Sequence, residues 1–90
     1  MVLAGLHPSP GYRAMIAVLD GNFVEASALY AEAGIVVFEA EARLRAAEQL
    51  LTAGRSAEGQ VELEKALTFY RSVGATLFIE RGERLLARSA

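Results

Sequence analysis

The side chains that most often do chemistry in proteins are few in this chain and stand apart from one another. There is one histidine, His7, and there is no cysteine. An imidazole acts as a general base only beside a nucleophile, and it binds a metal only together with further ligands. The sequence brings neither close to His7. Ser9 and Ser56 lie outside any Gly-x-Ser-x-Gly setting, and we interpret both as helix caps. We therefore predict no catalytic residue and no enzyme activity.

Two groups of acidic residues could supply oxygen ligands to a cation: Glu39, Glu41 and Glu48, and Glu58, Glu62 and Glu64. Arginine and lysine alternate with them at helical spacing, which is typical of a solvated helix face carrying ion pairs. The glycines stand singly, so they form no phosphate-binding loop of the Gly-x-Gly-x-x-Gly or Walker type. The sequence therefore predicts no metal site and no cofactor.

Positive charge is concentrated near the C-terminal end, at Arg71, Arg81, Arg84 and Arg88. The last three share one helix face, which could meet nucleic acid or an anionic partner. Arginine near a helix C-terminus also offsets the macrodipole, and Glu80 and Glu83 interleave with the stripe. The net charge of the chain is only −2, whereas nucleic-acid-binding domains usually carry a clustered basic face. We expect nucleic acid not to be a partner.

Composition indicates a small helical protein. Hydrophobic residues make up 53% of the 90 residues and only two are proline, which argues against disorder. No apolar run approaches the roughly 20 residues of a membrane span, so we expect no membrane association. The absence of cysteine permits a reducing compartment, and we expect a cytoplasmic protein. Residues 1–8 are expected to be a flexible N-terminal segment, and residues 9–90 one helical domain.

One segment of the sequence occurs twice in similar form. The segment from Gly21 to Ala33 recurs from Gly54 to Leu67, so one unit of about 34 residues is used twice. Glycines at 34, 54 and 74 are expected to end helices in the left-handed conformation. Between these stops we predict five helices: 10–19 capped by Ser9, a second capped by Asn22 and ending before residue 34, 36–53, one capped by Ser56 that ends before residue 74, and one capped by Thr76 that runs almost to the terminus.

The third of these helices shows the clearest apolar stripe, formed by Val37, Ala40, Leu44, Ala47 and Leu51. The pairs Glu39 with Arg43 and Glu41 with Arg45 are placed on its far side. Short turns make neighbouring helices antiparallel, and we expect the fourth helix to pack on the third through Leu63, Leu67 and Tyr70. The predicted fold class is all-α, built from antiparallel helical hairpins.

The motif Gly-Asn-Phe-x-Glu-Ala followed by Leu-Tyr-x-x-Ala at 21–33 resembles the second half of a tetratricopeptide repeat, and 54–67 is similar to it. The segment 40–76 also resembles the C-terminal helical repeats of large bacterial regulators, such as nucleotide cyclases and LuxR-type ATP-binding transcription factors. The resemblance implies a superhelical stack of about five helices. The chain departs from the family pattern at Arg43, where a large aromatic is preferred, and at Gly59, where alanine is preferred.

The resemblance implies a non-catalytic protein-interaction or self-association module, part of a larger bacterial signalling or transcriptional regulator. The partner would be another protein or a second copy of the chain. By analogy with the family, the first helix of each hairpin lines the partner-binding groove, which nominates Met15, Val18, Glu41, Leu44 and Glu48. Leu44 fits the core equally well. The alternative is a regulatory helical domain that binds a small effector or DNA.

Overall fold

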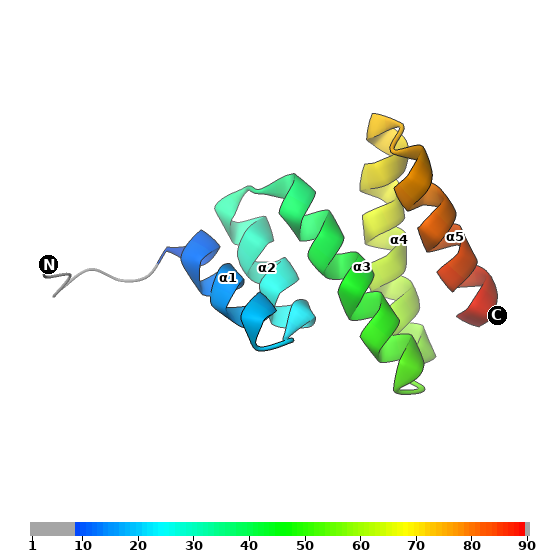
Figure 1. Ribbon diagram of the computed structural model, residues 1–90, viewed down its shortest axis with the longest axis horizontal. Helices are drawn as coiled ribbons and strands as arrows, with labels where there is room; N and C mark the ends of the chain where they lie inside the picture. The colour runs from blue at the N-terminus through cyan, green and yellow to red at the C-terminus, as the bar shows by residue number, and fades with distance from the viewer. Residues whose placement is uncertain (1–8, 90) are drawn as a thin grey trace, which may run out of the picture.

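The computed structural model describes residues 9–89, which form five α-helices (Figure 1). The helices are α1 (Pro10–Leu19), α2 (Phe23–Ala33), α3 (Val36–Thr52), α4 (Ser56–Val73) and α5 (Thr76–Ser89). Within residues 9–89 there is no strand, so the predicted all-α fold is confirmed. The expectation that residues 1–8 are flexible, and the interpretation of His7, lie outside the described residues.

All four connections use the same tight turn. Gly21, Gly34, Gly54 and Gly74 each have a positive φ, between 66° and 80°. The residue after each glycine donates its backbone N–H to the carbonyl five positions earlier, as Asn22 does to Ala17 at 2.8 Å and Arg55 to Leu50 at 2.8 Å. This is the Schellman pattern, which satisfies carbonyls at the helix end. The predicted glycine stops are confirmed, and each turn reverses the chain direction.

The first two helix starts agree with the prediction. The Ser9 hydroxyl accepts the N–H of Tyr12 at 3.2 Å, and the Asn22 side chain accepts the N–H of Glu25 at 3.4 Å. The Glu25 carboxylate in turn accepts from the Asn22 amide nitrogen at 2.9 Å. Each cap satisfies one of the backbone donors that a helix leaves open at its N-terminus.

The predicted caps Ser56 and Thr76 are wrong, because α4 and α5 begin one residue earlier. The carbonyl of Arg55 accepts the N–H of Gly59 at 3.0 Å, and the carbonyl of Ala75 accepts that of Ile79 at 2.9 Å. The residue that follows each glycine therefore closes one helix and caps the next. In so short a turn no residue is left for a separate side-chain cap.

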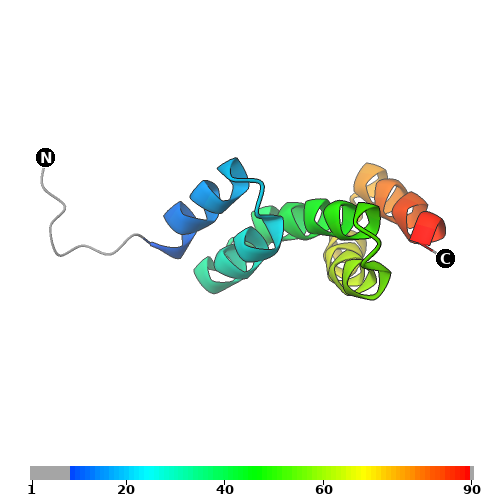
Figure 2. The same ribbon diagram turned by 90° about the horizontal axis from the view of Figure 1, so that it is seen from below.

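Each helix packs on the next, and the whole is elongated, with extents of 50 × 29 × 16 Å. Figure 2 shows α1 and α5 on one side of α3, and α2 and α4 on the other. Two clusters of buried side chains hold the helices together. The first joins α1, α2 and α3 through Ala14, Ala17, Ala26, Leu29, Tyr30 and Ala42. The second joins α3, α4 and α5 through Ala40, Leu44, Ala47, Leu63, Ala66, Leu67, Tyr70 and Leu85.

Helix α3 belongs to both clusters and buries two faces. Ala40, Leu44 and Ala47 face α4, as predicted, whereas Ala42 belongs to the cluster with α1 and α2. Val37 was placed in the buried stripe, but it is 58% exposed. It lies four and eleven residues before Glu41 and Glu48, which is the spacing of one helix face. That face of α3 belongs to neither cluster of buried side chains, and we call it the open side of α3.

Arg43 is also placed differently from the prediction. Its side chain is only 13% exposed and forms ion pairs of 2.8 Å with Glu39 and with Glu62 of α4. The pairing with Glu39 is confirmed, but the pair lies between α3 and α4 rather than on the far side. The reason is helical phase, since position 43 is three residues after Ala40 and four before Ala47, both of which are buried.

Two helical glycines allow close contacts that a side chain would prevent. Gly59 of α4 packs against Leu51, where an added Cβ would lie 3.0 Å from Leu51 Cγ. Gly82 of α5 packs more tightly, because its Cβ would lie 2.5 Å from Leu67 Cδ2. Leu67 is only 1% exposed, so its side chain has little room to shift. Gly82 therefore sets the distance between α4 and α5.

We expect Gly82→Ala to lower the free energy of unfolding by about 1–2 kcal/mol, because overpacking outweighs a gain in helix propensity of about 1 kcal/mol. The control is Gly11→Ala in α1, where the added Cβ would meet Ile35 Cδ1 at an ordinary 3.4 Å. We expect that variant to be neutral or slightly stabilised. Urea unfolding of both proteins measures the difference. A Gly82→Ala protein as stable as the parent would contradict the close packing of α5 on Leu67.

Candidate partner-binding site

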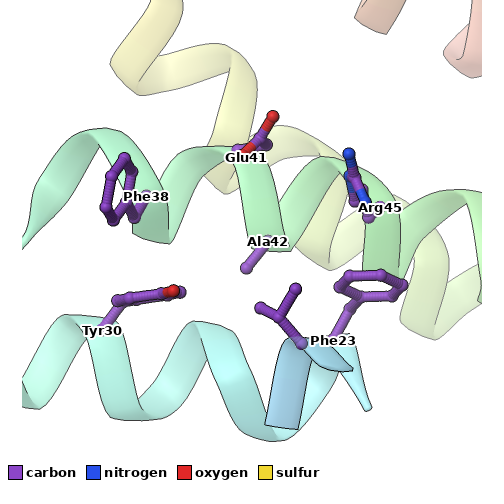
Figure 3. A pocket seen from close by; sticks show the side chains of 7 residues that line it. Phe23, Tyr30, Phe38, Glu41, Ala42 and Arg45 are labelled. Carbon is purple, nitrogen blue, oxygen red and sulfur yellow. The ribbon is translucent and has the colours of Figure 1, made fainter. Parts of the chain in front are cut away.

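A small hollow of about 140 Å³ opens where α1, α2 and α3 meet. Val18 of α1, Phe23 and Tyr30 of α2, and Phe38, Glu41, Ala42 and Arg45 of α3 line it (Figure 3). Four larger hollows on other faces are more open to solvent. The small side chain of Ala42, which is 3% exposed, leaves the space between the aromatic rings. The hollow exists because Ala42, where α3 meets α1 and α2, has too small a side chain to fill the space.

The walls of the hollow are aromatic and held in place. Tyr30 and Phe38 meet edge to face, with ring centroids 5.5 Å apart and planes at 69°. Tyr30 is 9% exposed and belongs to the core, whereas Phe38 is 53% exposed. At the other end the Arg45 guanidinium carbon lies 5.4 Å from the centroid of the Phe23 ring, which is cation–π geometry. The hollow therefore offers a mainly aromatic apolar surface to a visiting group.

Two opposite charges stand at the rim. Glu41 and Arg45 extend from α3 on the side away from the α2 ribbon (Figure 3). The predicted ion pair between them does not form, because Arg45 lies over Phe23 instead. Among the described residues Glu41 has no ion-pair partner, so its carboxylate is available to a cationic group. One end of the rim is acidic and the other is basic.

The structure brings together two of the five residues that the sequence nominated for a groove. Val18 and Glu41 line the hollow. Met15 is 49% exposed on α1 but does not line it, and Glu48 is engaged in an ion pair with Arg81 of α5 at 2.8 Å. Leu44 has no exposed surface, so its nomination is wrong. It points toward α4 because it shares the face of Ala40 and Ala47.

Sequence reasoning missed the aromatic residues of this site. Phe23, Tyr30 and Phe38 stand at helical spacing, which is typical of packing residues. For Tyr30 that is correct, whereas Phe38 is exposed and Phe23 half-buried. Phe38, Ala42 and Arg45 are spaced four and seven residues apart, which marks a second face of α3, out of phase with Ala40 and Leu44. An aromatic residue on that second face was the signal available.

The open side of α3 continues toward α5 through a polar contact. Arg81 Nη2 bonds to Glu48 Oε1 at 2.8 Å and joins the two helices. Tyr70 of α4 is buried nearby and stacks on Phe78, with ring centroids 4.8 Å apart. Burial, together with the Glu41 carboxylate, raises the pKa of the Tyr70 phenol, while Arg81 lowers it. The phenol therefore stays neutral at physiological pH. The charges on this side of α3 are those of Glu41, Glu48 and Arg81.

The C-terminal arginines do not form a uniform basic surface. Arg71 pairs with Glu83 at 3.3 Å and Arg81 pairs with Glu48. Of the residues in the predicted stripe, Arg84 and Arg88 have no acidic partner within the described part of the chain. Among residues 9–89, no cluster of histidine and acidic side chains could hold a metal ion. In the same part of the chain no helix is long and apolar enough to cross a membrane.

Comparison of the chain with protein-family models, with curated proteins and with solved structures finds no match in any of the three. The likeness to tetratricopeptide repeats therefore stays a prediction from the residues at 21–33 and 54–67.

Proposed function

We propose that the chain is a non-catalytic protein-interaction module, whose hollow between α1, α2 and α3 receives one apolar side chain of a partner segment. The observation that carries the proposal is the aromatic hollow itself. It combines exposed Phe38 with the ordered rings of Phe23 and Tyr30 and opens on the exposed side of α3. Anchoring a single aromatic or aliphatic side chain in such a pocket is the usual basis of peptide recognition.

The size of the hollow supports a peptide anchor over a free small molecule. Sites for drug-sized ligands usually enclose about 300–1,000 Å³, whereas this hollow measures about 140 Å³. That space suits one side chain, and the remaining binding energy would come from contacts outside it. Val37, which is 58% exposed and lies one turn before Glu41 on α3, extends the apolar surface beyond the hollow.

The rim charges give the partner segment a direction. A basic residue of the partner would lie near Glu41, and an acidic residue or a carboxyl terminus near Arg45. Because the two rim residues are one helical turn apart, about 6 Å, the partner charges would flank the anchor closely. We expect the recognised motif to carry one apolar residue between a basic and an acidic residue.

The test is selection from a library of displayed random peptides, followed by measurement of affinity for the selected sequences. We expect enrichment of peptides with one large apolar residue between a basic and an acidic one. Phe38→Ala should weaken their binding by about fivefold or more, since truncation of an anchor contact typically costs above about 1 kcal/mol. Phe38 is 53% exposed, so the substitution should change stability little.

The matched control is Val61→Ala on α4, which is 52% exposed and lies away from the hollow. We expect its peptide affinity to equal that of the parent protein. Equal loss in both variants, or selection of no peptide, would contradict the proposed site. Far-ultraviolet circular dichroism of both variants verifies that the helices are intact.

A further inference from the structure

Helix α1 has a second apolar face that nothing in the described chain covers. Tyr12, Ile16 and Leu19 are 52%, 40% and 76% exposed, and Met15 beside them is 49% exposed. These positions follow helical spacing and point away from Ala14 and Ala17, which are buried against α2. Both ribbon views show α1 at one end of the elongated molecule (Figures 1 and 2). The stripe is distinct from the hollow, which takes only Val18 from this helix.

The charges beside this stripe are arranged for an identical partner. Arg13 and Asp20 lie on the same flank of the stripe, seven residues apart, which is about 10.5 Å along the axis. Neither side chain has an ion-pair partner among the described residues, and both are exposed. Two copies of α1 placed antiparallel about a two-fold axis near Ile16 bring each Arg13 opposite the Asp20 of the other copy. The two-fold keeps a given flank on the same side of both helices, so both pairs form together.

We propose that a second copy of this chain docks on the α1 stripe, antiparallel and two-fold symmetric. Ile16 meets its own counterpart near the axis, and Tyr12 of each copy packs toward Leu19 of the other. Two ion pairs between Arg13 and Asp20 fix the register. A parallel arrangement would place the two Arg13 and Asp20 flanks on opposite sides of the interface, so neither ion pair could form, and it is disfavoured.

The size of the stripe sets the strength of this dimer. Stable interfaces bury about 800 Å² on each partner, and four side chains from a single ten-residue helix supply an interface at the small end of that range. We therefore expect a dissociation constant in the micromolar range, so that monomer and dimer are both populated at accessible concentrations. The interface leaves the hollow between α1, α2 and α3 free, which makes this inference independent of the proposed function.

The first experiment is analytical ultracentrifugation of the whole chain and of charge-reversed variants. We expect a concentration-dependent dimer, weakened by about tenfold or more in Arg13→Glu and in Asp20→Arg, because each change turns two attractive pairs into repulsive ones. The double variant Arg13→Glu with Asp20→Arg restores opposite charges across the axis and should regain most of the parent affinity. Failure of the double variant to recover, or a parent protein that is monomeric at all concentrations, would overturn the proposal.

A second experiment tests whether the two-fold axis lies near residue 16. The chain contains no cysteine, so a single introduced thiol reports on one position. Ile16→Cys should form a disulfide-linked dimer under mild oxidation, because the two copies of residue 16 lie face to face across the axis. Leu77→Cys on α5, at an equally open position that is 78% exposed in the parent, is the control and should stay monomeric under the same oxidation. Equal cross-linking of both variants would show random collision and overturn the proposal.

Discussion

Replacement of Leu67 by alanine should lower the free energy of unfolding by about 2–5 kcal/mol, the largest effect we expect from any single truncation in this chain. Leu67 is 1% exposed and belongs to the cluster that joins α3, α4 and α5. Its Cδ2 also fills the space above Gly82. Removing the side chain therefore leaves a cavity among three helices, which cannot all collapse onto it. Urea or thermal unfolding measures the loss.

The control for this substitution is Leu77→Ala, since Leu77 is 78% exposed on α5. We expect its stability to stay within about 0.5 kcal/mol of the parent. A further control uses Gly82→Ala in the Leu67→Ala background. There the new methyl group enters the vacated space, so its cost should shrink or change sign. Additive losses in the double variant would mean that the two positions do not touch.

Replacement of Arg43 by alanine should destabilise the protein by about 2–4 kcal/mol, although arginine is a residue usually found at the surface. Arg43 pairs with Glu39 and Glu62, and the side chains of Arg43 and Glu62 are only 13% and 14% exposed. Without the guanidinium, two carboxylates face each other across the α3 and α4 contact with little access to water. Chemical unfolding of the variant gives the magnitude.

The matched comparison is Arg55→Ala, which removes an ion pair to Glu58 whose side chains are both 58% exposed. Exposed pairs contribute about 0–1 kcal/mol, so we expect little change. Adding Glu62→Gln to Arg43→Ala removes one of the unpaired charges and should recover part of the stability. If Arg43→Ala and Arg55→Ala cost the same, Arg43 is not a structural link between the helices.

The near-repeat, the glycine stops and the apolar periodicities were enough to predict the number of helices and most of their bounds. These features are local, because a left-handed glycine or an amphipathic spacing acts within a few residues. The caps predicted at Ser56 and Thr76 were wrong, because Arg55 and Ala75 hold the cap positions instead. The turn before each helix is completed by a backbone hydrogen bond of the residue after glycine, such as Arg55 to Leu50, and that bond leaves no trace in the residue types.

The candidate site was predictable only in part. Val18 and Glu41 were nominated from the first helices of the hairpins, and both line the hollow. Leu44 was expected in the core and also nominated for the groove, and Phe38 was not singled out, because α3 buries two faces and a single periodic stripe describes only one of them. The exposure of each aromatic ring depends on how α2 packs against α3. That packing is a property of the tertiary structure.

By itself, the sequence determined the all-α class, the five helices and the glycine turns after the second, third and fourth helices, because each depends on local backbone preference. Only the tertiary structure decided that Arg43 lies inside a helix contact, that Ala42 leaves a hollow between aromatic rings, and that the Tyr12, Ile16 and Leu19 face is uncovered. These outcomes depend on the angle and distance at which α1, α2, α3 and α4 cross. Those distances are set by contacts between residues far apart in the chain, which no local pattern records.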